Sequence, residues 1–509
     1  MKIKILALII IMVLWCGCCL INDTPAAYNG VGDVSASDSG VVIAEAGKYK
    51  DLDYTFLRTF NYGDEVADKA MIIYDSVKEL KNSTDERLIE GRYIRTKGYH
   101  YVGDKGGACY LISDTKSSFG SIELSNGLYA NIINDTYTFA GIRWAVISVI
   151  QYGAYGNGIY SDQNAINDAI QAADNAVGKN GVTRAIIYIP EGEYKVTDQL
   201  HIKASKINIV GEGDKSIIFT DNDYRKTADY YEFFIMVQEA KDIFLSGFKI
   251  EAREVDIYKY MRQVILSDCH NIYIHKLTMI VPQEAWSGFY YEDKQYTNLT
   301  LYSGNKNITV DGCYMEQMSG TYRGANLGIL DFWQRGEENI TVMNCEFHDN
   351  ARDEQIGIFS LSGSKTSYIK NVDFINNKMY SYKPPYVDLY GNRQMCFTVA
   401  YHDSPNVEDI HIAGNYFISE VDSKFMTFGN VKECVVEDNV FEIYSSYGIT
   451  GMVFDSSNAD ANNIIVKNNE FYMTARDDNN QGKAAISIGN ITIKDNRIIT
   501  VSPLLFYYP

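Results

Sequence analysis

Asp353 and Glu354 stand side by side just before a short apolar run. Two carboxyl groups can share the work of hydrolysing a glycosidic bond, and an inverting enzyme holds them roughly 6.5–9.5 Å apart with a water between them. Neighbouring residues of a strand point to opposite faces, so this pair can work together only if the chain turns there. If Ile356 and Ile358 face the core, Asp353 shares the outward direction of Gln355, which makes Asp353 the better single candidate.

Two other groups could complete such a site. Asp331 precedes the acid pair and could supply the partner of Asp353 from a neighbouring strand, at a separation set by the strand spacing of about 4.8 Å plus side-chain reach. His402 is the nearest histidine on a following strand. Because acids are also common in solvated turns, a structural role for all of them stays open.

β-Elimination on a uronate is the alternative chemistry. It needs a base that removes the proton next to the carboxylate and a cation that acidifies this proton. The candidate bases and cations of this stretch are Arg352, Lys378, Arg393 and His402. Calcium is the cofactor such a reaction could use, and its oxygen ligands could be Asp353, Glu354 and Asp403. No calcium loop of specific spacing is present, so we assign no metal ligand.

Aromatic residues could line a groove for sugar. The chain has 40 tyrosines, and the segment 283–296 brings Trp286, Tyr290 and Tyr291 close together. Such rings stack on the faces of pyranoses, although aromatic residues also pack well on strand surfaces. We slightly prefer the groove.

A degenerate repeat from about residue 241 is the element that would position these residues. Nine segments, from "KDIFLSGFKI" to "NITIKDNRI", carry β-branched residues in alternation and turns rich in Asn, Asp and Gly, which is typical of strands. The residue before the last two of each segment marks one column: Phe248, Leu277, Cys313, Cys345, Val372, Asn415, Asn439, Asn469 and Asn496. Stacked coils bury a common core, so the repeat predicts a parallel β-helix, with a ladder of stacked asparagines.

The remaining sequence predicts the ends of this solenoid. The segment 49–145 reads as a small mixed α/β capping domain, with helical periodicity over 64–80. Ser161 can cap a helix that buries Ala165, Ile166 and Ala169, and this helix would close the N-terminal end of the β-helix.

The N-terminus carries the pattern of a secretory signal: two lysines, an apolar run and small residues over 1–21. Cys18 could be lipidated, and an uncleaved anchor is the alternative. A flexible tether follows over 22–48. We therefore expect an extracellular or cell-surface protein that meets the membrane only through its N-terminus.

Charge and cysteine content narrow the partners. The net charge of −19 speaks against nucleic acid and also repels a polyanionic glycan unless a cation or a basic patch offsets the field. Six cysteines are scattered beyond the leader without metal spacing, so they are expected to be small buried residues: Cys109, Cys269, Cys313, Cys345, Cys396 and Cys434.

The segments "VIQYGAYGNGIYSDQNAINDAIQAA", "IIYIPEGEYKV" and "INIVGEG" follow one another within residues 148–215. They resemble the opening of the pectate lyase superfamily domain of the rhamnogalacturonase and epimerase-like type. The resemblance implies an all-β fold, a right-handed single-stranded parallel β-helix over 146–509. The preceding "GYHYVGDKGGACYLIS" resembles the small domain that stands before this β-helix in phage tailspike-like proteins.

The family contains hydrolases, lyases, epimerases and carbohydrate-binding proteins, so the fold leaves the reaction open. "RDEQIGIFSLSG" resembles the D-D motif of its polygalacturonase-like hydrolases, which carries that motif onto Asp353 and Glu354. "GANLGILDFW" matches the N-T-D strand with Leu327 in the place of the catalytic acid, and G-H-G and R-I-K are absent. The first hypothesis is an exported polysaccharide hydrolase or lyase. The second is a non-catalytic glycan-binding protein or adhesin, and a phage receptor-binding spike is disfavoured.

Overall fold

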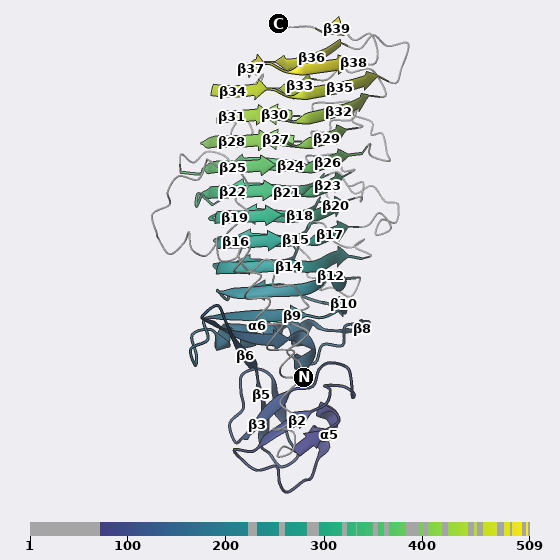
Figure 1. Ribbon diagram of the computed structural model, residues 1–509, viewed down its shortest axis with the longest axis vertical. Coiled ribbons are helices and arrows are strands. Elements are labelled where there is room, and N and C mark those ends of the chain that lie inside the picture. Colours follow the sequence, from purple (N-terminus) through teal and green to yellow (C-terminus); the bar gives the residue numbers. More distant parts are fainter. Residues whose placement is uncertain are drawn as a thin grey trace.

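The computed structural model is an elongated stack of β-coils above a small N-terminal domain (Figure 1). It describes residues 72–221, 232–253, 260–281, 295–317, 323–331, 333–349, 355–360, 366–382, 397–400, 406–419, 426–445, 452–455, 462–475, 483–488, 491–500 and 505–506. The predicted leader, lipidation site and tether lie outside these residues. Within the described residues, no helix is long and apolar enough to span a membrane.

The small domain combines one helix with a five-stranded sheet, as predicted. The sheet has the order β1-β2-β3-β5-β4. Its elements are β1 (Ile72–Tyr74), α5 (Val77–Asn82), β2 (Tyr93–Thr96), β3 (Cys109–Ser113), β4 (Ser121–Glu123) and β5 (Tyr129–Ile133). The helix predicted over 64–80 is wrong at β1, and α5 begins only after Ser76, whose side chain accepts a hydrogen bond from the backbone N–H of Glu79.

The predicted capping helix is present as α6 (Gln163–Ala176). It buries Ala165, Ile166 and Ala169, which confirms the expected apolar face. The cap residue is Asp162 and not Ser161, so the helix begins one residue later than a cap at Ser161 implies. The Asp162 carboxylate instead accepts the backbone N–H of Tyr155 at 2.6 Å. Burial, the largest influence, raises the pKa of Asp162 to about 6.

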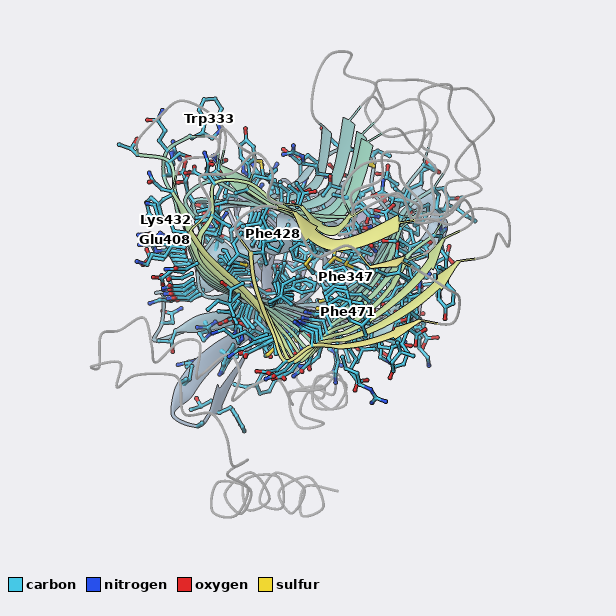
Figure 2. The ribbon with its side chains drawn as sticks, turned by 90° about the horizontal axis from the view of Figure 1, so that it is seen from above. Trp333, Phe347, Glu408, Phe428, Lys432 and Phe471 are labelled. Atoms are coloured by element: carbon cyan, nitrogen blue, oxygen red, sulfur yellow. The ribbon has the colours of Figure 1, made fainter. Side chains whose placement is uncertain are left out.

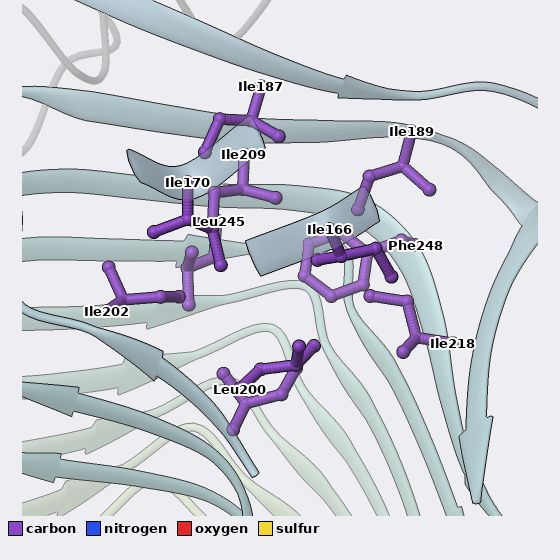
Figure 3. Close-up of a pocket in the computed structure, with 11 residues that line it drawn as sticks. Ile166, Ile170, Ile187, Ile189, Leu200, Ile202, Ile209, Ile218, Leu245 and Phe248 are labelled. Atoms are coloured by element: carbon purple, nitrogen blue, oxygen red, sulfur yellow. The ribbon is translucent and has the colours of Figure 1, made fainter. Parts of the chain in front are cut away.

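The first coils pack against this helix. Their elements are β6 (Asp135–Phe139), β7 (Ile142–Ser148), the 3-10 helix η1 (Val149–Tyr152), β8 (Asn157–Ser161), β9 (Arg184–Ile189), β10 (Gly192–Lys195), β12 (Ile207–Thr220) and β14 (Lys241–Ala252). Eleven apolar side chains line a small cavity between α6 and these coils, among them Ile166 and Ile170 of the helix (Figure 3). The cap thus closes the N-terminal end of a dry core.

Above this level each coil contributes three strands to two long parallel sheets. The first strands of the coils are β11 (Leu200–Ile202), β13 (Glu232–Gln238), β15 (Tyr260–Ser267), β18 (Gln295–Tyr302), β21 (Arg323–Asp331), β24 (Ile356–Ser360), β27 (Phe397–Val399), β30 (Met426–Phe428), β33 (Met452–Asp455), β36 (Lys483–Ile488) and β39 (Leu505–Phe506). The second strands are β16 (His270–His275), β19 (Lys306–Asp311), β22 (Glu337–Met343), β25 (Ile369–Ile375), β28 (Val407–Ala413), β31 (Lys432–Glu437), β34 (Asn462–Lys467) and β37 (Ile491–Lys494).

The third strands form one edge of the stack in Figure 1. They are β17 (Thr278–Val281), β20 (Tyr314–Gln317), β23 (Glu346–Asp349), β26 (Lys378–Ser381), β29 (Tyr416–Ser419), β32 (Val440–Ser445), β35 (Glu470–Ala475) and β38 (Arg497–Thr500). Two residues join each second strand to its third strand, and the first of the two has a positive φ, as at Asn344 (φ 55°) and Asn376 (φ 55°). Asn, Asp and Gly adopt this conformation most readily, which explains the composition of these turns.

The second residue of this corner forms the predicted ladder. The side-chain amide of Asn415 donates to Asn439, and that of Asn439 to Asn469, both at 2.9 Å. Asn377 precedes Asn415 in the column, since its amide donates to Asn415 at 3.1 Å. The assignment of Val372 to this column was therefore wrong, because Val372 lies in β25, paired with Ile340.

Four of the six cysteines expected to be buried are buried. Cys313 and Cys345 continue the asparagine column, and the backbone N–H of Cys313 lies 3.4 Å from the sulfur of Cys345. Cys269, Cys313, Cys345 and Cys434 are buried thiols and Cys109 is half-buried. Cys396 lies outside the described residues.

Aromatic side chains fill the interior of the coils. Viewed along the axis, Phe347, Phe428 and Phe471 point inward, whereas Trp333, Glu408 and Lys432 lie on the outside (Figure 2). Phe441 and Phe471 stack with their ring centroids 4.8 Å apart. The spacing equals that of neighbouring parallel strands, so each coil repeats the packing of the one below.

Candidate functional site

The outer side of the third strands carries many polar aromatic and acidic residues, interrupted by apolar residues such as Ile418 of β29. Alternate residues of a strand point outward, and the strands are in register, so these side chains form columns along the axis. One column contains Tyr314, Glu346, Lys378 and Tyr416, each paired with the next. We call the following residues the tyrosine–carboxylate face: Tyr314, Glu316, Glu346, His348, Tyr380, Tyr382, Tyr416, Glu442, Tyr444, Glu470 and Tyr472.

Phenol hydroxyls of this face donate to neighbouring carboxylates. Tyr314 donates to Glu316 at 2.5 Å, and Tyr472 donates to Glu470 at 2.7 Å. Glu442 accepts from two phenols, those of Tyr416 and Tyr444, the latter at 2.9 Å. A carboxylate offers about four acceptor positions, so each one retains acceptor capacity toward a ligand.

Burial and these carboxylates hold the phenols protonated. Burial is the largest cause that raises the pKa of Tyr314 well above its ordinary value, and the hydrogen bond to Glu316 adds to it. Tyr416 follows the same pattern, since burial first and then its hydrogen bond to Glu442 raise its pKa. The hydrogen bond to Glu470 leads at Tyr472, where the pKa is also raised. The hydroxyls of Tyr314, Tyr416 and Tyr472 therefore keep their protons at neutral pH and act as donors.

His348 lies at the centre of the face and joins two coils. Its Nε2 lies 2.7 Å from a Glu346 oxygen, and its Nδ1 lies 2.9 Å from the hydroxyl of Tyr382 on the next coil. The side chain of His348 is 15% exposed and that of Glu346 39% exposed. The group is thus within reach of a ligand while its imidazole is held on both sides.

The rings of this centre stack on one another. His348 and Tyr380 are nearly parallel, with centroids 4.5 Å apart, and Tyr380 and Tyr382 are parallel at 6.4 Å. Because the ring faces meet along the axis, a ligand on this surface meets ring edges, with their hydroxyls and nitrogens. This differs from the stacking groove expected at Trp286, Tyr290 and Tyr291, which lie outside the described residues.

Buried amides hold the strands of the face from within. The side chains of Asn298 and Asn326 donate to the main-chain oxygens of Glu316 and His348 at 3.2 and 3.1 Å. Gln355 donates in the same way to Tyr380 at 3.2 Å. All three amides are at most 1% exposed, so the backbone under the outward side chains is fixed by the core.

The structure corrects the expected role of Asp331. Its side chain is fully buried and accepts hydrogen bonds from the hydroxyls of Ser367 at 2.7 Å and Ser303 at 3.1 Å. The backbone N–H of Tyr368 donates to the same carboxylate at 3.0 Å. A carboxylate enclosed in this way cannot meet a polysaccharide, so these contacts assign Asp331 to the turn between neighbouring coils and not to catalysis.

The outward direction expected for Asp353 also loses its basis. Ile356 and Ile358 are buried as expected, but Gln355 is buried as well, with its side chain in the interior. The outward alternation therefore does not extend back to Gln355, and it gives no direction for Asp353. Most of the other predicted site residues lie outside the described residues: Arg352, Asp353, Glu354, Arg393, His402 and Asp403.

Lys378 is the predicted site residue that lies on this surface. It is exposed and begins β26, where it pairs with Glu346 of the coil below. His348, Glu346 and Tyr382 are not among the site residues predicted from the sequence. Their signal was present, because the two residues after each column marker begin a short alternating strand, as in "EFHD" and "KMYS".

The described residues contain no group of three or more His, Cys, Asp or Glu side chains that could hold a metal ion. The acids suggested as calcium ligands, Asp353, Glu354 and Asp403, are not among the residues covered by that statement. The calcium expectation therefore stays a prediction.

Comparisons of sequence and structure show which known proteins this chain is similar to. Over 74 residues the chain is 36% identical to "Plasmin and fibronectin-binding protein A" of Streptococcus pneumoniae, a stretch that is 14% of this chain and 10% of that protein. The tailspike protein gp49 of Acinetobacter baumannii bacteriophage Fri1, a capsular polysaccharide depolymerase, is similar in structure with a TM-score of 0.51 and 13% identity. That match covers 85% of this chain and 76% of gp49.

The tailspike protein 2 of Escherichia coli O157:H7 bacteriophage CAB120 matches 86% of this chain at 12% identity and a TM-score of 0.43, and the chain covers 51% of that protein. Residues 146–257 match the family described as "Rhamnogalacturonase A/epimerase, pectate lyase-like". With its parallel coils, capping helix and small N-terminal domain, this chain carries a parallel β-helix whose first part is similar to the pectate lyase-like family.

Proposed function

We propose that this protein acts outside the cell or on its surface, where it binds a polysaccharide along the tyrosine–carboxylate face and cleaves it. The observation that carries the proposal is the recurrence of outward phenol–carboxylate pairs on three of the coils, at Tyr314–Glu316 in β20 and at Tyr444–Glu442 and Tyr472–Glu470 in the neighbouring strands β32 and β35. Carboxylate and phenol oxygens accept hydrogen bonds from the hydroxyls of sugars. A repeating ligand can use such a repeating surface.

The dimensions of the face suit a linear chain. Coils are stacked at about 4.8 Å, so a polymer that follows the axis meets a new row of polar edges at each step. The gp49 tailspike, which has this fold, is a capsular polysaccharide depolymerase. The predicted secretory leader agrees with a substrate outside the cell.

Charge limits the kind of glycan. The chain has a net charge of −19, and four carboxylates lie on the face, at Glu316, Glu346, Glu442 and Glu470. Lys378 and Arg497 lie on two other third strands, β26 and β38. A densely anionic chain would be repelled along most of this surface, so the proposed ligand has neutral sugars at most positions.

The test is a binding and product assay on the full chain. Wild type is incubated with neutral and acidic polysaccharides, with calcium and with chelator, and both new reducing ends and unsaturated uronates are measured. Glu442→Ala should weaken glycan binding about tenfold, because it leaves two phenols without their acceptor and removes one for the sugar. Glu408→Ala is the matched control, since Glu408 pairs with Lys370 on the outer side of the second strands.

Equal loss in both variants, or no binding of any glycan by wild type, would contradict the proposal. Binding and new reducing ends without unsaturated products would identify a hydrolase. Unsaturated products that vanish with chelator would identify a calcium-dependent lyase.

A non-catalytic adhesin is the second candidate. The observation that favours it is the match to "Plasmin and fibronectin-binding protein A" over 74 residues. Leu327 also stands where the resembling hydrolases carry their acid, and it is fully buried. Glycan or host-protein binding by wild type, with no product from a broad panel, would favour this function.

A further inference from the structure

Glu346, His348 and Tyr382 form a line of hydrogen bonds in which the protons can be assigned. A carboxylate only accepts, so the Nε2 of His348 that lies 2.7 Å from Glu346 carries the hydrogen. When the ring carries only this hydrogen, its Nδ1 accepts from the hydroxyl of Tyr382 at 2.9 Å. The phenol proton of Tyr382 thus points at a base that is itself oriented by a carboxylate.

This arrangement differs from the other tyrosines of the face. Tyr314, Tyr444 and Tyr472 donate directly to carboxylates, whereas Tyr382 donates to an imidazole. Histidine exchanges a proton readily near neutral pH, and a phenolate is a strong base because the phenol pKa is about 10. A relay of this type suits the removal of a weakly acidic proton.

In a polysaccharide, a weakly acidic carbon proton occurs at C5 of a uronate, next to the carboxylate. We propose that Tyr382 is the catalytic base of a β-elimination on isolated uronates within an otherwise neutral heteropolysaccharide, with His348 and Glu346 as its relay. The inference rests on the proposed function, since it concerns a glycan bound to the same face.

Lys378 projects from the same side of the strand as Tyr382 and can supply positive charge to a bound uronate. Lys378 and Tyr380 are alternate residues of β26, and Tyr382 continues the alternation, with its backbone N–H bonded to Asp349 at 2.8 Å. All three side chains therefore project from one side of the strand. The ammonium of Lys378 can pair with the substrate carboxylate and stabilise the charge that develops when C5 loses its proton.

The acidic surroundings explain why the uronates must be isolated. Glu346 and Glu316 lie on the coils below Lys378, and Glu442 lies above it. One uronate can sit at the ammonium, but uronates at the neighbouring positions would face carboxylates.

The step conserves atoms and protons. The proton of Tyr382 moves to Nδ1 of His348 as the phenolate oxygen takes the C5 proton of the substrate. The C4–O4 bond breaks while a double bond forms between C4 and C5, and the imidazolium returns its proton to the departing O4 through water. One product ends in a hydroxyl group and the other begins with an unsaturated uronate.

The experiment follows unsaturated uronates by ultraviolet absorbance for the full chain acting on hyaluronan and gellan, in which glucuronate is separated by other sugars, and on polygalacturonate. Wild type should act on one of the first two and not on polygalacturonate. Tyr382→Phe should lower kcat by about 10²–10⁴-fold while KM stays within about twofold. Tyr160→Phe, an exposed tyrosine of β8 remote from the face, is the matched control.

Glu346→Gln tests the relay separately from the base. It keeps the shape of the side chain but removes its charge, so kcat should fall about tenfold with KM unchanged. A rise in KM with unchanged kcat would show that Glu346 serves binding alone and would overturn the relay. Circular dichroism on each variant separates these outcomes from misfolding.

If Tyr382→Phe forms unsaturated products as fast as wild type does, the inference is overturned. Action of wild type on polygalacturonate alone would also overturn it. Binding and hydrolysis without unsaturated products would overturn it while the proposed function stands. If wild type neither binds nor cleaves any glycan, the proposed function itself fails.

Discussion

The side-chain amide of Asn326 donates a 3.1 Å hydrogen bond to the main-chain oxygen of His348. Asn326 is fully buried, while the imidazole of His348 faces outward. The same amide also donates to Met315 and to the side-chain oxygen of Asn298. One interior residue therefore fixes the backbone beneath the centre of the tyrosine–carboxylate face.

Asn326→Ala should destabilise the fold by about 1–3 kcal/mol, because buried carbonyl groups lose their donor. It should also weaken glycan binding although it removes no exposed atom, since the strand that carries His348 is no longer held. Urea unfolding and a binding titration measure the two effects. An unchanged unfolding midpoint would mean that these amides contribute little to the fold.

Asn415→Ala should destabilise the fold more than a change in a second, exposed ladder of asparagines on the second strands, where Asn371 bonds Asn339 and Asn339 bonds Asn307. Its amide bonds Phe374 at 2.8 Å and Asn439 at 2.9 Å, and its oxygen accepts from the backbone of Asn377 at 2.8 Å. The loss leaves several buried groups unpaired, so we expect at least about 2 kcal/mol in the free energy of unfolding.

Asn371→Gly is the control for this change. Asn371 is exposed, has a φ of 55° and bonds Asn339 at 2.9 Å. Glycine tolerates that backbone conformation, so the cost should stay below about 1 kcal/mol. Similar losses at both positions would contradict the distinction between a buried and an exposed ladder.

Glu337→Gln should make stability less sensitive to pH. Burial, and to a smaller extent Asp331, raise the pKa of Glu337 well above its ordinary value. The folded protein thus keeps this proton to higher pH than the unfolded chain does. The stabilisation is full below about pH 4.3, the ordinary pKa of Glu, and is lost as pH rises toward the raised value.

Wild type and Glu337→Gln should therefore be similar at pH 4, and the variant should be the more stable of the two at pH 7, by about 1.4 kcal/mol per unit of raised pKa. Urea unfolding at both values measures the difference. A variant that is less stable at pH 7 would show that the charged carboxylate is itself held by the fold.

Cys345→Asn should extend the asparagine ladder by one coil. The sulfur of Cys345 lies 3.4 Å from the backbone N–H of Cys313, and the backbone N–H of Cys345 already donates to Asn377 at 2.8 Å. The side-chain oxygen of an asparagine at this position can accept from the backbone N–H of Cys313, and its amide can donate to the side-chain oxygen of Asn377. These bonds should stabilise the fold by about 1 kcal/mol. Cys345→Leu should instead cost about 1–3 kcal/mol through overpacking. Thermal unfolding compares the two, and an asparagine variant below wild type would contradict the expectation.

The sequence predicted the coils well because their determinants are local. Alternating β-branched residues, glycine and asparagine corners, and the apolar face of α6 can all be recognised within a few residues. The error at Val372 has a local cause as well, because asparagines of two different ladders lie close to it in the chain, Asn371 outside and Asn377 inside. Residue type alone does not separate them.

The role of Asp331 could not be predicted, since burial depends on partners from other coils. Ser303 and Ser367, which enclose its carboxylate, are 28 and 36 residues away in the chain. The same holds for His348 and Tyr382, which are 34 residues apart and meet only when two coils stack. The face itself follows from alternation, but the contacts within it do not.

The two-residue corner between second and third strands never changes in length from β16 to β38, whereas the stretch that leads from a third strand to the next coil ranges from 501–504 to 382–396. Stacking therefore constrains one part of every coil and leaves another free to lengthen. That freedom adjoins the tyrosine–carboxylate face, so chain can be inserted beside it while every hydrogen-bonded row keeps its register. The ligand specificity of such a molecule can therefore change while the stacked coils stay the same.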